Sequence, residues 1–304
     1  MDEALKKLVS GVVAVPRNQL LMPLADLPDE TPGWPRFNRQ GQWQICEANP
    51  LAQMNADGYE PFRLSAIPAD WPTDLGRQIQ NIEAYCGTIN NLDHVEQEIE
   101  RVAGHRALIE RRFGAGLAAR TLYLAVAGPK LMHEAAERHF RTDYPGHGEL
   151  VEKVVFDFLK RQTCPRRFHH ALRVSLSATT LGQGADYKEW LSSIPPHSVR
   201  IVALVAPFAG VSIDAGRLDL RLPGLERRSF VEMDIFVLTQ LAAQFPAVIS
   251  GTTLVGPADI LRLTKDDAAG THSCGLYLDD RLVQVSANDN WLADPSASGV
   301  LAIL

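Results

Sequence analysis

Apolar residues recur at intervals of three and four positions over residues 73–113, with one break at Asn90–Asn91. This spacing places them on one face of a helix, so the segment predicts a pair of amphipathic helices. On the second helix, Glu98 and Arg101 stand three positions apart and predict an ion pair on the helix surface.

From residue 120 onward, short apolar runs alternate with amphipathic runs of helical length. The runs that predict strands are Thr121–Ala127, Leu172–Ser177, Val199–Ala206, Val248–Leu254, Leu276–Leu278 and Leu282–Ser286, with a hairpin over Val211–Leu222. The runs that predict helices are Lys130–Arg141, Glu149–Arg161, Ala185–Ser192 and Ser229–Phe245. Such alternation is typical of an α/β fold. We expect a parallel or mixed, Rossmann-like sheet with flanking helices over roughly residues 120–290, with Leu172–Ser177 and Val199–Ala206 as interior strands.

The preceding part of the chain has a different composition. Residues 16–72 hold nine of the 19 prolines and three of the five tryptophans. Proline disfavours helix, so this segment predicts irregular chain with short strands such as Gln42–Cys46 and Phe62–Ala66. We therefore divide the sequence into residues 1–115, a Pro/Trp-rich segment plus the helical pair, and residues 116–304, the α/β domain.

Composition and charge exclude several classes of protein. The chain has 304 residues, is 46% hydrophobic and carries a formal net charge of -6, which suits a globular protein and argues against one that coats nucleic acid. The first apolar run, Leu8–Val15, is too short to span a bilayer, so we expect no membrane association and predict a short docking helix there. The four cysteines form no C-x-x-C pair, which favours reduced thiols and a cytoplasmic location.

A cationic run beside a loop of small residues suggests a ligand. Five lysines and arginines and no acid lie between Lys160 and Arg173, and the loop Ser177–Gly184 leads into a predicted helix. Cations and the amides of a helix N-terminus attract anions. We therefore predict a site for a phosphorylated or otherwise anionic, nucleotide-like small molecule, with an ordinary solvated loop as the alternative. Its candidate residues are Arg166, Arg167, Ser177, Thr179, Thr180, Gly182 and Gly184.

The loop does not identify that ligand further. It lacks the lysine of a P-loop and the complete G-x-G-x-x-G of a dinucleotide site. The histidine and carboxylate pairs elsewhere, such as His133 with Glu137, fit a solvated helix face better than a metal site. His147 and Glu149, in a turn, are compatible with half of an iron triad but have no evident third ligand. We therefore assign no metal and no cofactor.

Asp234 is the most anomalous acidic residue. Within a helix over Ser229–Phe245 it falls among apolar residues, where a carboxylate needs a partner. We predict that Asp234 is buried and has a charged or multiply hydrogen-bonding partner. Two roles for Asp234 are then open: a structural residue held by its partner, or a catalytic residue.

His272 and Cys274 stand two positions apart just before a predicted strand, and on a strand two such side chains share a face. A cysteine and a histidine so placed form a possible nucleophilic pair. The alternative is a buried cysteine that acts as a small apolar residue.

Three classes of function remain open after this reading. The first is the binding of an anionic small molecule, as an enzyme or a sensor. The second is a cysteine-dependent hydrolase or transferase that uses Cys274 and His272. The third is a non-catalytic assembly component with residues 16–72 as an arm that binds a protein partner.

Overall fold

The computed structural model describes the helices, the strands and the short connections between them. The described residues are 12–13, 34–37, 43–46, 75–89, 92–105, 107–109, 121–163, 167–170, 175–177, 181–205, 230–245, 253–263, 272–279, 282–290 and 297–303. The strand at Phe62–Ala66, the hairpin at Val211–Leu222 and the domain boundary near residue 115 lie outside the described residues. The predicted docking helix near the N-terminus also lies outside them, except for Val12–Val13, which form a strand and not a helix.

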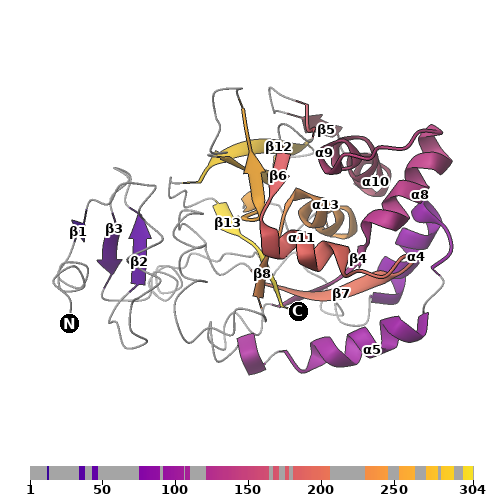
Figure 1. Ribbon diagram of the computed structural model, residues 1–304, viewed down its shortest axis with the longest axis horizontal. Coiled ribbons are helices and arrows are strands. Elements are labelled where there is room, and N and C mark those ends of the chain that lie inside the picture. Colours follow the sequence, from indigo (N-terminus) through magenta and orange to yellow (C-terminus); the bar gives the residue numbers. More distant parts are fainter. Residues whose placement is uncertain are drawn as a thin grey trace.

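A four-stranded antiparallel sheet forms one side of the fold (Figure 1). In spatial order it consists of β4 (Leu122–Ala127), β7 (Val199–Val205), β14 (Leu301–Ile303) and β8 (Phe230–Glu232). Every neighbouring pair in this sheet runs antiparallel. The apolar run predicted as an interior strand at Val199–Ala206 is confirmed as β7, which lies between β4 and β14.

A seven-stranded sheet forms the other side. Its strands are β5 (Arg167–His170), β6 (Leu181–Gln183), β9 (Thr253–Val255), β10 (Asp259–Leu261), β11 (His272–Asp279), β12 (Leu282–Asp289) and β13 (Ala297–Gly299). The antiparallel hairpin of β11 and β12 is its longest pairing. Only β5 with β12 and β9 with β13 run parallel among the described strands.

The expected Rossmann-like sheet is therefore wrong. That expectation treated alternating strands and helices as crossover units, which would make neighbouring strands parallel. In the structure, β4 and β7 are antiparallel neighbours, although three helical stretches (α8, α9–η4–α10 and α11) and the strands β5 and β6 separate them along the chain. The other predicted interior strand also differs, because residues 175–177 lie outside any strand and residues 171–174 are not described.

The two sheets meet through one short segment of chain. Residues 297–299 belong to the seven-stranded sheet as β13, and residues 301–303 belong to the four-stranded sheet as β14. Between them, Val300 N–H donates to the carbonyl of Val255 at 3.2 Å, and the Val300 carbonyl accepts from Met233 N–H at 3.0 Å. The end of β8 is thereby held beside the turn between β9 and β10.

Helices fill and cover the space around the sheets. They are α4 (Leu75–Cys86), α5 (Leu92–Ala103), α8 (Pro129–Phe140), α9 (His147–Leu150), α10 (Phe156–Thr163), α11 (Ala185–Ser192) and α13 (Ile235–Gln244). A π-helix, η4 (Val151–Val155), joins α9 to α10 without a break in helical backbone. None of these helices is long and apolar enough to cross a membrane.

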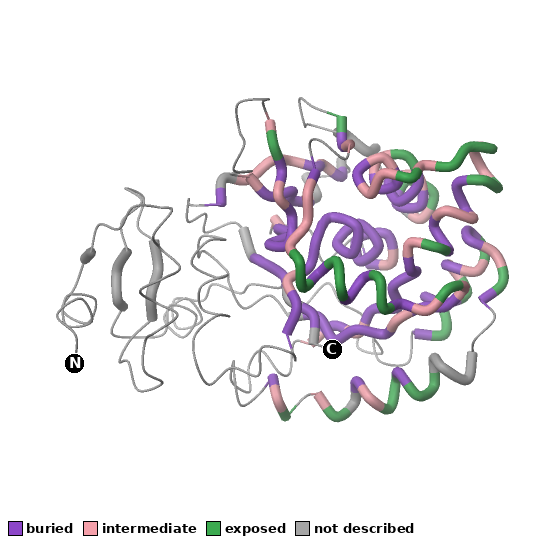
Figure 2. Tube along the Cα trace, viewed as in Figure 1, coloured by how far each residue is buried: buried purple, intermediate pink, exposed green. Residues whose placement is uncertain are grey.

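Helix α13 is the centre of the core (Figure 2). It contacts β4 in one sheet and β9 and β11 in the other. Nine of its ten residues, all except Gln244, are buried. The prediction of one helix over Ser229–Phe245 is wrong at its start. Residues 230–232 form strand β8, and the helix begins only after Asp234, which is its N-cap. The remaining predicted helices correspond to α4, α5, α8, the α9–η4–α10 helix and α11.

A separate three-stranded sheet forms near the N-terminus. It consists of β1 (Val12–Val13), β3 (Trp43–Cys46) and β2 (Trp34–Phe37), paired antiparallel in that order. The predicted strand at Gln42–Cys46 is confirmed by β3.

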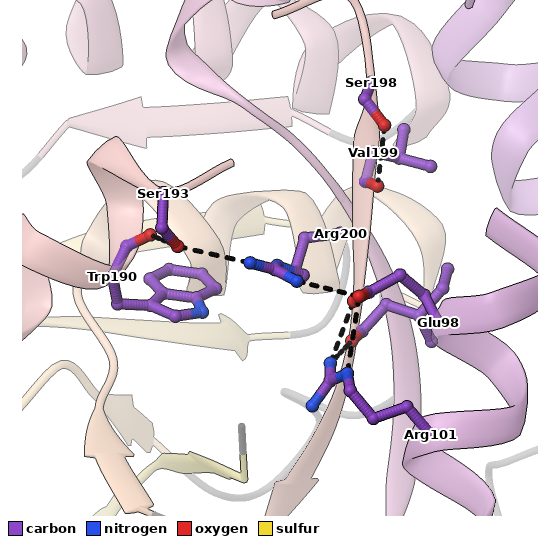
Figure 3. A network of polar contacts seen from close by, with 8 residues as sticks. Glu98, Arg101, Trp190, Ser193, Ser198, Val199 and Arg200 are labelled. Atoms are coloured by element: carbon purple, nitrogen blue, oxygen red, sulfur yellow. Dashed lines mark hydrogen bonds and ion pairs between the residues drawn. The ribbon is translucent and has the colours of Figure 1, made fainter. Parts of the chain in front are cut away.

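A buried ion-pair network anchors α5 to the four-stranded sheet (Figure 3). Glu98, 4% exposed, accepts hydrogen bonds from Arg101 at 2.9 Å and from Arg200 of β7 at 2.7 Å. Arg101 also donates to the carbonyl of Ile201 at 3.1 Å. Burial alone raises the pKa of the Glu98 carboxyl, but the two arginines outweigh it and lower that pKa below its ordinary value. The pair predicted between Glu98 and Arg101 is present, with Glu98 buried rather than on the surface.

Two glutamine side chains close the outer edge of β4. Gln78 of α4 donates to the Tyr123 carbonyl at 3.1 Å and accepts from Ala125 N–H at 2.9 Å. Gln240 of α13 accepts from Ala127 N–H at 2.8 Å and donates to the Ala127 carbonyl at 3.2 Å. Each side-chain amide thus stands in for the backbone of a further strand. This pairing removes an open strand edge, which is otherwise a template for aggregation.

Replacing Gln240 by leucine should destabilise the fold. Gln240→Leu leaves the buried N–H and carbonyl of Ala127 without partners, at about 1–3 kcal/mol for each group. We expect urea denaturation to show a fall in the free energy of unfolding of at least about 2 kcal/mol. The matched control is Gln97→Leu on the exposed face of α5. This variant should change the free energy of unfolding by less than about 0.5 kcal/mol. Equal effects of the two variants would contradict the role assigned to Gln240.

Candidate functional site

The Asp234 carboxylate lies where the two sheets meet. Asp234 follows β8, and as the N-cap of α13 its Oδ1 accepts hydrogen bonds from Phe236 N–H at 3.0 Å and Val237 N–H at 3.3 Å. Aspartate is favoured at an N-cap because it satisfies amides that lack a partner within the helix. The positive end of the helix dipole also stabilises its charge. These interactions explain how a fully buried carboxylate is tolerated at this position.

Three side chains from three other elements converge on the same carboxylate. Tyr187 of α11 donates its hydroxyl proton to Oδ1. His147, the first residue of α9, places Nε2 at 2.7 Å from Oδ2. Gln183, the last residue of β6, donates from Nε2 to Oδ2 at 2.9 Å. With the two amides, the carboxylate has five donor groups around it, as a buried carboxylate requires. We call His147, Gln183, Tyr187 and Asp234 the Asp234 cluster.

The contact between His147 and Asp234 determines which imidazole nitrogen carries the proton. A 2.7 Å approach of nitrogen to oxygen needs a proton between them. The carboxylate only accepts, so the proton belongs to Nε2 of His147. Gln183 Nε2 lies 2.8 Å from the same ring nitrogen because both nitrogens are directed at Oδ2. Nδ1 is left as the basic nitrogen of the neutral ring, and none of the described residues bonds it.

The members of the cluster differ in their access to solvent. The side chain of Asp234 is fully buried, whereas that of His147 is 18% exposed. The imidazole also lies beside the ring of Phe236, with 5.6 Å between ring centroids. The exposed part of His147 can therefore exchange protons with a molecule outside, while its partner stays in a fixed, dry environment.

A second buried carboxylate supports the same helix N-terminus. Both oxygens of Asp259, on β10, accept from Ile235 N–H, at 3.3 and 3.2 Å. A Cβ on Gly256 would lie 2.5 Å from Asp259 Oδ2 and 2.9 Å from Asp234 Cα. The close approach of the two aspartates to the helix therefore requires glycine at position 256.

Burial and the two aspartates hold the neighbouring acidic groups in their neutral forms. Burial first, and then the charge of Asp234, raises the pKa of the Tyr187 hydroxyl well above its ordinary value. Burial first, and then the charges of Asp259 and Asp234, raises the pKa of the Cys274 thiol well above its ordinary value. Tyr187 therefore acts as a fixed donor to Asp234, and Cys274 remains a thiol.

The predicted anion-binding residues are only partly within the described chain. Arg166, Thr179 and Thr180 lie outside it, Arg167 is the first residue of β5, and Ser177 precedes the stretch that leads to β6. Gly182 lies in β6 and Gly184 is the N-cap of α11, on either side of Gln183. The predicted loop thus supplies Gln183 to the Asp234 cluster, the helix that follows it supplies Tyr187, and the loop's role in binding an anion stays a prediction.

The predicted cysteine and histidine pair lies on β11. Cys274 is fully buried, and its thiol is hydrogen-bonded to Asp259. His272 is partly exposed and pairs across the sheet with Asp289 and Leu261. Among the described residues, no group of three or more His, Cys, Asp or Glu side chains could hold a metal ion.

Sequence reasoning identified Asp234 but missed three of its partners. Its prediction that Asp234 is buried and has several hydrogen-bonding partners is confirmed. The sequence pairs His147 only with Glu149, and no local pattern marks Gln183 or Tyr187 as site residues. For Asp234 itself, the sequence holds a second signal: an aspartate directly before the apolar run Ile235–Leu238 is typical of a helix N-cap.

Comparison of the chain with protein-family models, with curated proteins and with solved structures finds no match. The chemistry of the site therefore follows from its own geometry.

Replacing Asp234 by asparagine should cost substantial stability. In Asp234→Asn the new amide group would face the donors of Tyr187, His147 or the helix amides. We expect the free energy of unfolding, measured by urea denaturation, to fall by at least about 2 kcal/mol. Asp143→Asn is the matched control, because Asp143 also pairs with a histidine, His133 at 3.1 Å, but is 63% exposed. That variant should change stability by less than about 0.5 kcal/mol, and a comparable loss in both would contradict the importance of burial.

The thiols of Cys86 and Cys274 should resist alkylation in the folded protein. The thiolate is the reactive form, and burial raises the pKa of Cys86 to about 12 and that of Cys274 well above its ordinary value. We expect peptide mass spectrometry after iodoacetamide treatment at neutral pH to find both unmodified, and both modified in urea. Rapid native modification of Cys274 would instead favour the cysteine-dependent mechanism.

Proposed function

We propose that the protein is an enzyme in which His147 transfers protons, as general base and general acid, with its ring oriented by Asp234. The observation that carries this proposal is the 2.7 Å contact between His147 Nε2 and the buried Oδ2 of Asp234. A partly exposed imidazole held by a buried carboxylate is the arrangement by which histidine acts as a base near neutral pH.

Each neighbour has a defined part in this chemistry. Neutral His147 takes a proton on Nδ1 from a water or a substrate hydroxyl and becomes an imidazolium. Asp234 stabilises that charge through Nε2 and keeps the ring from rotating. Tyr187 and the amides of Phe236 and Val237 hold the carboxylate still, so little reorganisation accompanies the proton transfer. The reaction class this supports is hydrolysis or group transfer by an activated oxygen nucleophile.

The other two functional classes have less support. A nucleophilic Cys274 would have to ionise beside Asp259 in a site closed to solvent. An assembly component would not need an imidazole poised between a buried carboxylate and solvent. An anionic substrate is compatible with the proposed chemistry, since a protonated His147 attracts negative charge.

The proposal predicts a specific tautomer of His147. Long-range ¹H–¹⁵N correlation spectra at a pH where the ring is neutral should show the proton on Nε2 and none on Nδ1. Diethyl pyrocarbonate, which acylates a bare ring nitrogen, should modify His147 in the native protein and be located there by mass spectrometry. His147→Gln identifies the resonance. A proton on Nδ1 would contradict the proposed role.

Activity is tested with chromogenic probes of several bond types, namely p-nitrophenyl esters, phosphates, phosphodiesters and glycosides. We expect His147→Gln to lower turnover of the accepted probe by about 10²–10⁴-fold while the fold is retained. His133→Gln, on the partly exposed pair with Asp143, is the matched control and should keep full activity. Turnover that survives in His147→Gln would show that His147 is not the catalytic base.

A further inference from the structure

The chain directly after His147 packs tightly against the backbone of Ser177. A Cβ on Gly148 would lie 2.7 Å from Ser177 N and 3.0 Å from Ser177 O, so only glycine permits the approach. Neighbouring Cα atoms are about 3.8 Å apart. Ser177 therefore lies against the residue that directly follows His147 in the chain.

The backbone around Ser177 is fixed on both sides. Leu176 N–H donates to Glu152 Oε2 at 2.7 Å, and the Ser177 carbonyl accepts from Leu181 N–H at 2.9 Å. Leu176 is buried, whereas Ser177, like His147, is partly exposed. Glu152 lies in the π-helix η4, a distortion that is frequent at functional sites. The segment thus holds a partly exposed serine on a fixed backbone beside Gly148 of α9.

We propose that Ser177 is the nucleophile that His147 activates, and that the substrates are acyl compounds such as esters. This inference rests on the proposed function of His147. It gives the order His147, Ser177 and Asp234 along the chain, and such a triad is defined by geometry and not by sequence order.

The proposed reaction needs no other reactant than water. As the Ser177 Oγ attacks the carbonyl carbon, its proton passes to Nδ1 of His147. The tetrahedral adduct collapses, the alcohol leaves with that proton, and the acyl group remains on Oγ as an ester. A water then gives a proton to Nδ1 and attacks the same carbon, and His147 returns the proton to Oγ as the acid departs. Asp234 stays ionised throughout.

A fluorophosphonate probe and p-nitrophenyl acetate test this assignment in the 304-residue chain. The fluorophosphonate should label Ser177, identified by mass spectrometry, and p-nitrophenyl acetate should give a burst of p-nitrophenol. We expect Ser177→Ala to abolish labelling and to lower esterase turnover by at least about 10³-fold. His147→Gln should slow labelling by at least about tenfold. Ser175→Ala, two positions earlier and exposed, is the matched control and should label and turn over like the wild type.

The outcomes separate this inference from the function on which it rests. Esterase or other hydrolytic turnover that needs His147 but survives in Ser177→Ala would overturn the serine assignment and leave His147 as the base for a water. Labelling of a serine other than Ser177 would also overturn it. A third outcome would overturn the inference and the proposed function together. In it, no serine is labelled, no turnover depends on His147, and the proton is found on Nδ1 of His147. Circular dichroism of each variant confirms that the fold is retained.

Discussion

A buried carboxylate at the start of the central helix is the constraint around which this fold is arranged. Asp234 carries charge at a place closed to water, and that is tolerable only while every oxygen lone pair meets a donor. Those donors come from α9, β6, α11 and α13, so four elements must be in register at once. If any one of these elements is misplaced, the buried carboxylate loses a hydrogen-bond donor. The hydrogen bonds to the carboxylate therefore allow fewer arrangements of these four elements than apolar packing alone would.

The core also shows how polar side chains complete secondary structure that the backbone leaves unfinished. Gln78 and Gln240 pair with an edge strand, and Asp234 and Asp259 pair with the first amides of a helix. In each case a side chain from a distant part of the sequence satisfies a buried backbone group. The core of this protein therefore contains specific polar contacts at the places where regular structure ends.

Local sequence predicted the elements better than their pairing. Ala185–Ser192 matches α11, and Val199–Ala206 matches β7 to within one residue, because periodicity and capping act over neighbouring positions. The predicted strand direction was wrong because direction depends on which distant strands pair: β4 pairs antiparallel with β7, and β14, from the far end of the described chain, lies between β7 and β8. Burial of Glu98 depends in the same way on Arg200, 102 positions away. Among the site residues, only Asp234 left a trace in the local pattern, as a charge within apolar sequence.

The shared segment around Val300 has a consequence for how the protein acquires its structure. One short stretch of chain supplies a strand to each sheet, so neither sheet reaches its final width before the other does. Its partners β7 and β8 lie far back along the chain, and contacts of such long sequence separation are closed late and slowly. The hydrogen bond from Met233 to Val300 is adjacent to Asp234. The site therefore depends on a contact between distant parts of the chain, so chains that have not formed this contact would lack the support that it gives to the start of α13.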